Sequence, residues 1–570
     1  MVKEMKGTDA TIQSMIKNGT DVTFGYPGGQ VIPLFDTYLD YQDKIRNVLV
    51  RHEQGAAHAA EGYAKASGKV GVCISTSGPG ATNMVTGIMD AYMDNIPILA
   101  LGGQVPSKLI GNDAFQESDM IGITMPITKH NFQIRNANDI MPTMHKAYHI
   151  AQTGRPGPVY VDLTKDAQVS PVTSKKTDFI LKGFNPTIKG NPVQIKKASK
   201  MLLEAERPLI LAGGGVMAAN ASKELLKLVE MTNTPVATTM MGKGIIDENH
   251  PLCVGLVGMH GKKVANYASI NADLIIAIGC RFSDRITGDL SSYAERAKVI
   301  HIDVDPAEIG KNVEVDLPIV GNAKSVLEDI IKVTKVISQK EDSIWQQKIK
   351  QYVKECDCNP NRDSVPIDPV RVIKELNKVL KKEDIVTTGV GQHQMFAMHF
   401  LKMKSPRTFI SSGGAGTMGF GLPAAVGAKV ARPNSQVFDI DGDGSFQMTM
   451  QELGTCKEDQ IKVNPIIFRN NYLGMVRQWL ELFFDRRYSQ VNLPNHPDFV
   501  KICEAYGLGG EVITRPTEIA EGLKRQIKAD ETYLLDINIK QESNILPMLP
   551  PGGHLKDAFG GCMKGPGRFF

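Results

Sequence analysis

The sequence predicts an α/β protein made of three doubly wound parallel-sheet domains. Strand-like apolar runs alternate with helix-like patterns along the whole chain, as parallel α/β domains require. Glycine-rich turns follow many of these runs, at the sheet edge where ligands bind in such folds. Two stretches, near 166–192 and 338–369, break the alternation with Lys, Thr, Pro, Asn and charged residues. We therefore expect domains at 1–166, 190–337 and 369–546, followed by a Gly- and Pro-rich tail at 547–570 that forms a lid or a loose terminus.

Composition excludes several classes of protein. With 42% apolar and 22% charged residues, the 570-residue chain has ample core material and is not disordered as a whole. The formal net charge of +4 is not gathered in a basic block, so binding to nucleic acid or membrane has no electrostatic support. The first twenty residues lack the apolar stretch of a secretory signal, and no run reaches the about 18 apolar residues of a membrane helix. The eight cysteines form no paired metal site and indicate reduced thiols, so we expect a soluble, cytoplasmic protein.

The first block contains two segments that predict a strand followed by a glycine-rich turn, VTFGYPGG at 22–29 and KVGVCISTSGPGATN at 69–83. Between them, IRNVLVRHE predicts a strand that ends just before Glu53, and a helix of small residues follows. Small residues allow such a helix to pack closely against its neighbours. Taken alone, Glu53 is more simply an acidic residue that interacts favourably with the helix dipole.

The second block has the features of a nucleotide-binding sheet. Gly213, Gly214 and Gly215 follow a predicted strand in a G-x-G-x-x-A pattern, which is weak evidence alone. The next strand, PVATTM, lacks the terminal acidic residue that NAD-binding sheets use for the ribose, so NAD is disfavoured. A later strand ends at Asp303 and Asp305, which are suited to ribose or adenine hydroxyls. Three arginines, Arg155, Arg281 and Arg285, offer cations for a pyrophosphate.

The third block predicts a metal-bound diphosphate. The apolar run VFDI leads into Gly442-Asp443-Gly444 and Ser445, so Asp443 presents a carboxylate at a strand end where glycines let a ligand approach. A lone carboxylate would repel phosphates, and an Mg²⁺ ion between the two resolves the conflict. The next strand ends at Asn470, whose amide oxygen is a second ligand for the metal. The alternative is that GDG and NN mark two ordinary turns.

These residues carry a family resemblance. The GDG…NN arrangement resembles the metal–cofactor motif of thiamine-diphosphate enzymes, and NYLGMVRQWLELFFDRRYS resembles the acetolactate synthase (acetohydroxyacid synthase) large subunit. The similarity extends over about residues 5–550, and it implies pyrimidine-binding, central FAD-binding and diphosphate-binding domains in that order. The sequence departs from the family at Arg469, which stands where the first Asn of the pair is usual. In that register Asn470 remains the metal ligand and Tyr472 adds a backbone carbonyl.

The resemblance assigns further residues to the cofactors. Glu53 becomes the catalytic acid that exchanges a proton with the cofactor's aminopyrimidine. The residues implied for thiamine diphosphate are Pro79, Asn83, Gln392, His393, Gly416, Met418, Gly444 and Ser445. Those implied for FAD are Arg155, Gly213, Gly214, Gly215, Thr239, Met240, His260, Gly279, Arg281, Asp303 and Val304. Asn322 stands where the family has Asp, which makes a contact there less certain. The reaction has no net redox change, so the flavin is expected to be structural.

The reaction and its partners also follow from the resemblance. Pyruvate is decarboxylated, and the two-carbon unit condenses with a second pyruvate or with 2-oxobutanoate. The products, 2-acetolactate or 2-aceto-2-hydroxybutanoate, enter branched-chain amino-acid biosynthesis. Residues implied at the substrate channel are Gly29, Gln116, Lys165, Arg285 and Trp479, the last favouring the larger acceptor. The family implies a homodimer or tetramer with the site at the subunit interface, and a small regulatory subunit.

Five alternatives compete with this interpretation. Pyruvate oxidase and the catabolic, flavin-free acetolactate synthase share the architecture, but GMVRQW and RFSDRITG argue against both. Glyoxylate carboligase lacks a glutamate at the position of Glu53. An inactive relative that only binds is opposed by the intact Glu53, Asp443 and Asn470. An NAD dehydrogenase is opposed by the missing acidic residue in the second block.

Overall fold

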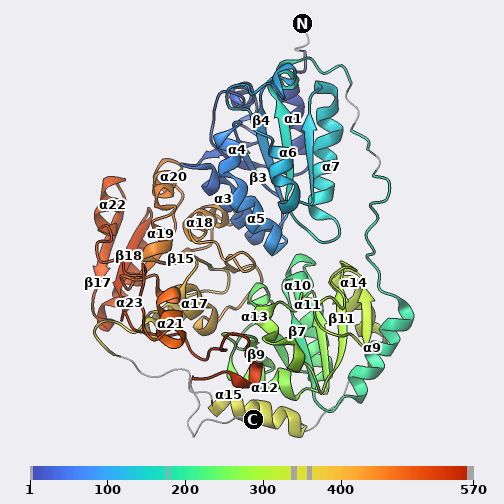
Figure 1. Cartoon of the computed structure of the whole chain (residues 1–570), viewed down its shortest axis with the longest axis vertical. Helices are drawn as coiled ribbons and strands as arrows, with labels where there is room; N and C mark the ends of the chain where they lie inside the picture. Colours follow the sequence, from blue (N-terminus) through green and yellow to red (C-terminus); the bar gives the residue numbers. More distant parts are fainter. Residues whose placement is uncertain (1–3, 175–176, 180, 336–342, 356–362, 561–570) are drawn as a thin grey trace.

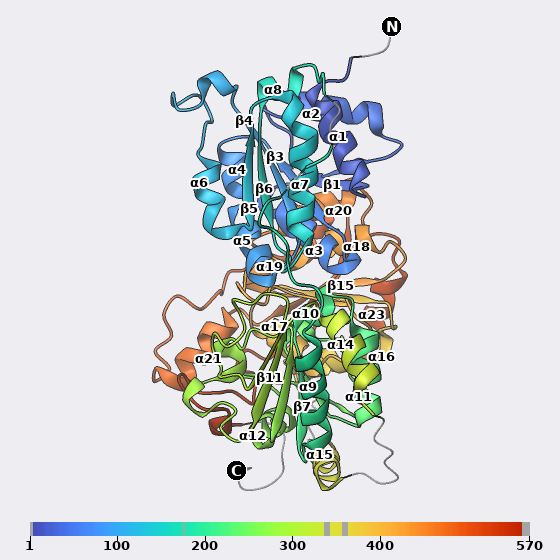
Figure 2. The same cartoon turned by 90° about the vertical axis from the view of Figure 1, so that its right-hand side faces the viewer.

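Three six-stranded sheets, all parallel, form the framework of the chain (Figure 1). The computed structural model describes residues 4–174, 177–179, 181–335, 343–355 and 363–560. Each sheet has helices on its faces (Figures 1 and 2). In Figure 1 the first domain (blue) is at the top, the central domain (green) lies below it, and the third domain (orange to red) lies to the left beside both. The predicted fold class is therefore confirmed.

The first sheet has the strand order β2-β1-β3-β4-β6-β5. Its strands are β1 (Val22–Gly25), β2 (Arg46–Leu49), β3 (Gly71–Ser75), β4 (Ile98–Gln104), β5 (His130–Ile134) and β6 (Val159–Thr164). Its helices are α1 (Gly7–Lys17), α2 (Ile32–Tyr38), α3 (Glu53–Ser67), α4 (Pro79–Asn83), α5 (Val85–Asp94), α6 (Met120–Thr124), α7 (Ile140–Gln152) and α8 (Lys165–Val169). Two separate apolar cores, one with α1 and α7 and the other with α3 and α5, bury the central strands on both faces.

The second sheet has the order β12-β11-β10-β7-β8-β9. Its strands are β7 (Pro208–Ala212), β8 (Val236–Thr238), β9 (Cys253–Leu256), β10 (Leu274–Ile278), β11 (Lys298–Asp303) and β12 (Leu317–Val320). Its helices are α9 (Pro192–Glu204), α10 (Gly214–Ala218), α11 (Ser222–Thr232), α12 (Lys263–Asn271), α13 (Asp284–Thr287) and α14 (Ala323–Val333). The order reverses between β7 and β10, which is the position where such sheets bind ligands.

The third sheet has the order β14-β13-β15-β16-β18-β17. Its strands are β13 (Ile385–Thr388), β14 (Phe409–Ile410), β15 (Val437–Gly442), β16 (Asn464–Arg469), β17 (Gly509–Ile513) and β18 (Tyr533–Asn538). Its helices are α16 (Pro369–Val379), α17 (Gln392–Phe400), α18 (Gly421–Ala431), α19 (Asp443–Phe446), α20 (Leu453–Glu458), α21 (Gly474–Phe483), α22 (Phe499–Ala505) and α23 (Ile519–Lys528). The neighbouring positions of β15 and β16 bring together the ends of the two strands that carry Asp443 and Asn470.

Helices α3 and α18 join the first domain to the third (Figure 1). Their contact depends on glycine, because a Cβ atom at Gly62 would lie 2.3 Å from the carbonyl oxygen of Ala424. A Cβ at Gly427 would lie 1.9 Å from the carbonyl oxygen of Ala59. The small-residue helix after Glu53 therefore packs with its backbone almost against that of its partner, as the sequence suggested.

The stretch at 338–369, which the sequence predicts to be a break between domains, contains a helix. Helix α15 (Ile344–Glu355) buries Trp345 and Ile349 in the core of the central domain. The Trp345 ring stacks on Tyr267, and its Nε1 donates a hydrogen bond to the carbonyl oxygen of Pro208. The high charge of the stretch hid this narrow apolar face.

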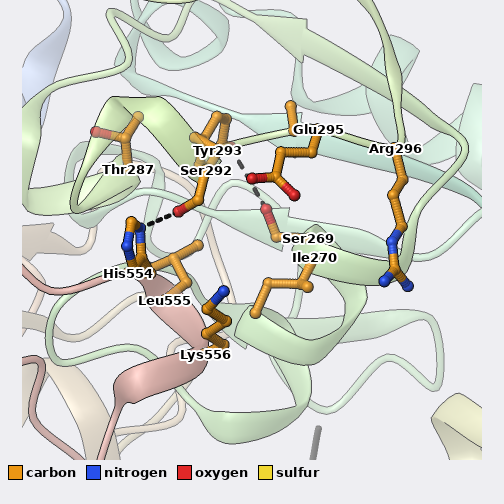
Figure 3. Close-up of a pocket in the computed structure, with 11 residues that line it drawn as sticks. Ser269, Ile270, Thr287, Ser292, Tyr293, Glu295, Arg296, His554, Leu555 and Lys556 are labelled. Carbon is orange, nitrogen blue, oxygen red and sulfur yellow. Dashed lines mark hydrogen bonds between the residues drawn. The ribbon is translucent and has the colours of Figure 1, made fainter.

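The tail at 547–560 is docked against the central domain, so the described part of it is not a loose terminus. Leu549 N donates to the carbonyl oxygen of Met259 at 3.1 Å, and Asp289 N donates to that of Gly553 at 3.0 Å. Tail residues His554 and Leu555 line a small cavity of about 90 Å³ with residues of the central domain (Figure 3). Residues 561–570 lie outside the described part of the tail.

Among the described helices, none combines the length and the apolar character needed to cross a membrane.

Candidate active site

The predicted site residues of the first and third domains lie in the loops after the carboxyl ends of parallel strands. In the third domain, Gln392 follows β13, Asp443 follows β15 and Asn470 follows β16. In the first, Gly29 follows β1, Glu53 follows β2 and Lys165 follows β6 directly. Since all strands of each sheet run in the same direction, each of these sets lies at one edge of its sheet.

Asp443 and Asn470 are in direct contact at the ends of β15 and β16. Asp443 Oδ2 accepts hydrogen bonds from the backbone N of Asn470 at 3.1 Å and of Asn471 at 2.6 Å, while its Oδ1 accepts from Gly444 N at 2.9 Å. Asn470 Oδ1 accepts from the backbone N of Tyr472 at 3.0 Å. Burial raises the pKa of Asp443 to about 6, and the backbone N–H groups oppose that rise.

This donor set fits a magnesium ion. Carboxylate, amide and carbonyl oxygens are the ligands that Mg²⁺ prefers, and Asp443, Asn470 and Tyr472 supply one of each kind within one loop pair. Asp443 is 1% exposed and Asn470 6% exposed, so both ligands are already withdrawn from bulk water. A cation here would stabilise the ionised form of Asp443, which burial disfavours.

Three loops of the third domain meet at Ser445. Its Oγ accepts hydrogen bonds from Val390 N at 3.3 Å and from Gly419 N at 3.1 Å. This arrangement places the turn before Gln392 and His393 beside the loop that carries Gly416 and Met418. Gly444 packs closely against neighbouring side chains, because a Cβ there would approach Leu473, Leu493 and the methyl group of Met418.

His393 and Gln392, both predicted to contact thiamine diphosphate, are buried. Burial lowers the pKa of His393 to about 3, so the ring is neutral at physiological pH. The Gln392 side-chain nitrogen donates to Gln478 Oε1 at 2.8 Å and to the Ser543 carbonyl at 2.9 Å. A Cβ at Gly474 would lie 2.3 Å from Gln392 Oε1 and 2.7 Å from Asn470 Nδ2. Gln392, predicted for the cofactor, and Asn470, predicted for the metal, therefore lie together at the start of α21.

Gly416 lies in the left-handed region at φ +67°, a conformation that favours glycine. Met418 is half-buried beside it. The contact of these two residues with thiamine diphosphate stays a prediction.

Glu53 begins α3 and is 9% exposed. Its Oε2 accepts a hydrogen bond from Asn83 Nδ2 at 2.9 Å, and its Oε1 lies 3.1 Å from where a Cβ of Gly80 would stand. Asn83 and Pro79 are the last and first residues of α4. The structure thus brings these three predicted residues together around one carboxyl group.

Four of the residues predicted for the substrate channel lie at three places in the structure. Lys165 Nζ donates to the carbonyl oxygen of Gly29 at 3.1 Å, so these two lie together. Trp479 is in α21, where its ring contacts Phe483 at 5.3 Å between centroids. Arg285 is exposed on α13, with Nε 3.6 Å from Asp284.

Gln116 belongs with the first domain. It lies at φ +60° against Gly78, whose Cβ would approach the Gln116 backbone at 2.8 Å, next to the α4 turn.

The predicted flavin residues gather at the switch point of the central sheet. A Cβ at Gly213 would lie 2.1 Å from the carbonyl oxygen of Gly279, and one at Gly215 would lie 2.6 Å from the Gly279 Cα. The glycine pattern thus has a packing function between two loops. Thr239 N donates to the Ala212 carbonyl at 3.0 Å, which places Thr239 and Met240 at the same edge.

Other flavin candidates have protein partners already. Arg155 Nη1 contacts Asp305 at 3.1 Å and Glu308 at 2.7 Å, linking the first domain to the second.

Burial raises the pKa of Asp303 to about 6, and its Oδ1 accepts a hydrogen bond from the backbone N of Asp305, with Val304 between them. Burial lowers the pKa of His260 to about 4. The carbonyl of Arg281 accepts from Asn312 Nδ2, and Asn322 caps α14 through Lys324 N.

Comparison with known proteins decides the family. Three family models match the chain: the thiamine pyrophosphate enzyme N-terminal TPP binding domain at 5–123, central domain at 195–330 and C-terminal TPP binding domain at 389–537. A probable acetolactate synthase large subunit of Methanocaldococcus jannaschii is 52% identical over 561 residues, covering 97% of this chain and 94% of the relative. The acetolactate synthase large subunit of Haemophilus influenzae is 43% identical over 565 residues, covering 98% of both chains.

This chain belongs to the acetolactate synthase large-subunit family of thiamine pyrophosphate enzymes. Family membership confirms the predicted resemblance, the enzymatic function as an acetolactate synthase and thiamine diphosphate as cofactor. The metal, the flavin and the roles of individual residues are taken up below as proposals.

Sequence reasoning missed several buried polar residues that surround the site of this family member. Gln478 is fully buried and links Gln392 to Ile545, just before the tail, through Ile545 N and the Ile545 carbonyl. Glu452 reaches from the third domain to the backbone of Arg51 in the first. Asp439 and Asp441 lie fully buried beneath Asp443 on β15. The acidic run DIDGD at 439–443 and Glu452 in QEL are plain in the sequence, but only the fold shows which groups they contact.

Proposed function

We propose that the chain makes 2-acetolactate from two pyruvate molecules, or 2-aceto-2-hydroxybutanoate from pyruvate and 2-oxobutanoate, using thiamine diphosphate with Mg²⁺ and FAD. The observation that carries the proposal is the contact between Asp443 and Asn470 at neighbouring strand ends. A second set, Glu53 with Asn83, stands at the corresponding edge of another sheet. One cofactor with a charged diphosphate at one end and an aminopyrimidine at the other requires both sets.

Each group has a distinct role in this proposal. Asp443, Asn470 and the Tyr472 carbonyl hold the metal, while Gln392, His393, Gly444 and Ser445 line the diphosphate. Glu53 holds a proton on its carboxyl oxygen and exchanges it with the aminopyrimidine nitrogen, and Asn83 keeps the carboxyl in place. When bound, the cofactor supplies a cationic ring that accepts the electron pair released by decarboxylation.

Substrate selection is assigned to residues around α21 and the first-domain loops. Trp479 shapes the acceptor pocket and favours the four-carbon acceptor. The exposed guanidinium of Arg285, whose Nε lies 3.6 Å from Asp284, is assigned to the acceptor carboxylate, an interaction for which arginine geometry is well suited. Lys165, Gly29 and Gln116 border the channel from the first domain.

The flavin is assigned to the central domain. Support comes from the loops at 213–215, 239–240, 279–281 and 303–304, which share one edge of the sheet near its switch point. The Arg155 contacts with Asp305 and Glu308 must open or be shared if this arginine also meets the flavin pyrophosphate. Since no net oxidation occurs, the flavin acts in structure and not in electron transfer.

The assembly is proposed to be a homodimer or tetramer in which the first domain of one chain faces the third domain of its partner. Relatives such as those of M. jannaschii and H. influenzae are named large subunits. We therefore include a small regulatory subunit among the partners.

An activity assay tests the proposal. Purified protein supplied with Mg²⁺, thiamine diphosphate and FAD should convert pyruvate to acetolactate and should prefer 2-oxobutanoate when both acceptors compete. Indifference between the acceptors would favour the catabolic type, and formation of acetyl phosphate would favour a pyruvate oxidase. A colourless preparation that stays active without FAD would remove the flavin from the proposal.

A further inference from the structure

Glu452 is a buried carboxyl group of the third domain that contacts the first domain. It ends the short helix η7 (Met450–Glu452) and is 1% exposed. Its Oε1 and Oε2 accept from the backbone N of Arg51 at 3.0 and 3.2 Å. Thr455 Oγ1 donates to Oε2 at 2.6 Å and fixes the carboxyl from the other side.

The segment that Glu452 contacts is the corner between β2 and α3, which carries Glu53. On one side of Glu53, the Glu452 carboxyl accepts a hydrogen bond from the backbone N of Arg51. On the other side it lies against Gly55, where a Cβ would stand only 2.3 Å from Glu452 Oε1. The absence of a side chain at Gly55 is therefore what allows the carboxyl to reach the corner.

The Arg51 side chain ties the same corner to the third domain independently. Its Nη2 donates to the Gly454 carbonyl at 3.3 Å and to Glu458 Oε2 at 2.9 Å. Glu458 is 65% exposed, so its ion pair is screened by solvent and adds little. Glu452, being buried and bonded to backbone, determines where the corner lies.

We propose that Glu452 is the positioning residue for Glu53, holding the β2–α3 corner so that the Glu53 carboxyl meets the aminopyrimidine at the correct distance. This inference rests on the role of Glu53 proposed above. The third domain of a chain would then control the placement of the acid in the first domain of the same chain.

The chemistry of the contact predicts which substitutions matter. Burial raises the pKa of Glu452 to about 7, yet both the ionised and the protonated carboxyl offer an oxygen to the Arg51 N–H. An amide oxygen does the same. Glu452→Gln should therefore retain function. Glu452→Leu keeps the bulk of the side chain but removes the hydrogen-bond acceptor, which leaves the buried N–H group of Arg51 unpaired.

Two measurements test the inference without relying on turnover. In the holoenzyme without substrate, exchange of the cofactor's thiazolium C2 proton for deuterium reports the action of Glu53. Glu452→Leu should slow this exchange by about 10- to 100-fold, the loss expected when a catalytic group shifts by about 1 Å. In the cofactor-free protein, amide hydrogen exchange in a peptide spanning 49–57 should become faster.

The matched control is Glu458→Gln, which removes the other acidic contact of Arg51 but leaves its backbone bond intact. It should leave both exchange rates near those of the wild type. If Glu452→Leu does not fold, Gly55→Ala displaces the carboxyl by contact and should slow C2 exchange in the same way. Normal C2 exchange in the folded Leu or Ala variant would overturn the inference.

Glu53→Gln separates this inference from the function on which it rests. If Glu53→Gln abolishes C2 exchange while Glu452→Leu leaves it unchanged, the proposed positioning role is wrong and the proposed role of Glu53 stands. If Glu53→Gln also leaves exchange unchanged, the proposed role of Glu53 is wrong. A Glu452→Gln variant as slow as Glu452→Leu would show that charge, not the acceptor, is required, and would overturn the positioning mechanism.

Discussion

At the scale of single residues, Asp443 is a buried and hydrogen-bonded carboxyl group that we propose as a metal ligand. Three backbone N–H groups hold its carboxyl in one orientation, and burial still raises its pKa to about 6. Asp443→Asn keeps the size but removes the anionic ligand. It should weaken Mg²⁺-dependent binding of thiamine diphosphate by about 10- to 100-fold, measured by titration of Mg²⁺ at fixed cofactor. The control Asp530→Asn changes an exposed acid of the same domain. Equal Mg²⁺ dependence in both variants would contradict the metal assignment.

A pH prediction concerns His399, whose ring lies in the interface between the third and central domains. Burial lowers its pKa to about 3, and its Nδ1 lies 3.2 Å from the His260 carbonyl oxygen. The unfolded chain, with a histidine pKa near about 6.5, binds a proton that the folded chain does not, so stability falls as pH decreases below that value. The loss reaches about 1.4 kcal/mol per pH unit. The melting temperature of the wild type should therefore fall more between pH 7 and pH 5 than that of His399→Gln. Parallel curves would show that His399 does not contribute.

At the scale of elements, the α3–α18 contact makes a prediction about packing. A Cβ at Gly427 would lie 1.9 Å from a backbone oxygen, which cannot move aside as a flexible side chain can. Gly427→Ala should lower the free energy of unfolding by about 1–3 kcal/mol, the usual cost of overpacking. Lys197→Ala, at an exposed position of α9, should have almost no effect in the same urea titration. A Gly427→Ala variant as stable as the control would mean that the two helices are not so closely packed.

The elements also show what sequence patterns predict well. Strand ends with glycine-rich turns placed Asp443 and Asn470 correctly at one sheet edge, because a buried parallel strand gives a continuous apolar signal. Helix α15 was not anticipated, because its apolar face is narrow and the surrounding residues are charged. The docking of the tail was also missed, because glycine and proline content reports local conformation and not tertiary contact.

At the scale of the whole molecule, the central question is which chains share a site. The proposal places the first domain of one chain against the third domain of another. Co-expression of Glu53→Gln and Asp443→Asn chains should then yield mixed dimers with one undamaged site, and about a quarter of the wild-type activity for random pairing. Each variant alone should be nearly inactive. No recovery in the purified mixed dimer would place both residues of a site in one chain.

Contacts between residues far apart in the sequence could not be predicted from the sequence. Glu452 and Arg51 are separated by 401 positions, and Gln392 and Gln478 by 86. No local pattern relates such pairs, and a buried Glu or Gln in a helix has no signature before its partner is known. The resemblance predicted the groups that we propose to act on the cofactor, whereas the fold was needed to find the residues that contact those groups.

The account depends most on a single spatial relation, between Glu53 and Asp443 on one cofactor. A crystal structure of the protein loaded with thiamine diphosphate and Mg²⁺ measures it directly. We predict that the Glu53 carboxyl lies within hydrogen-bonding distance of the aminopyrimidine nitrogen, while Asp443 and Asn470 coordinate the Mg²⁺ on the diphosphate of the same molecule. A cofactor bound to the metal with its pyrimidine remote from every Glu53 in the assembly would contradict the account.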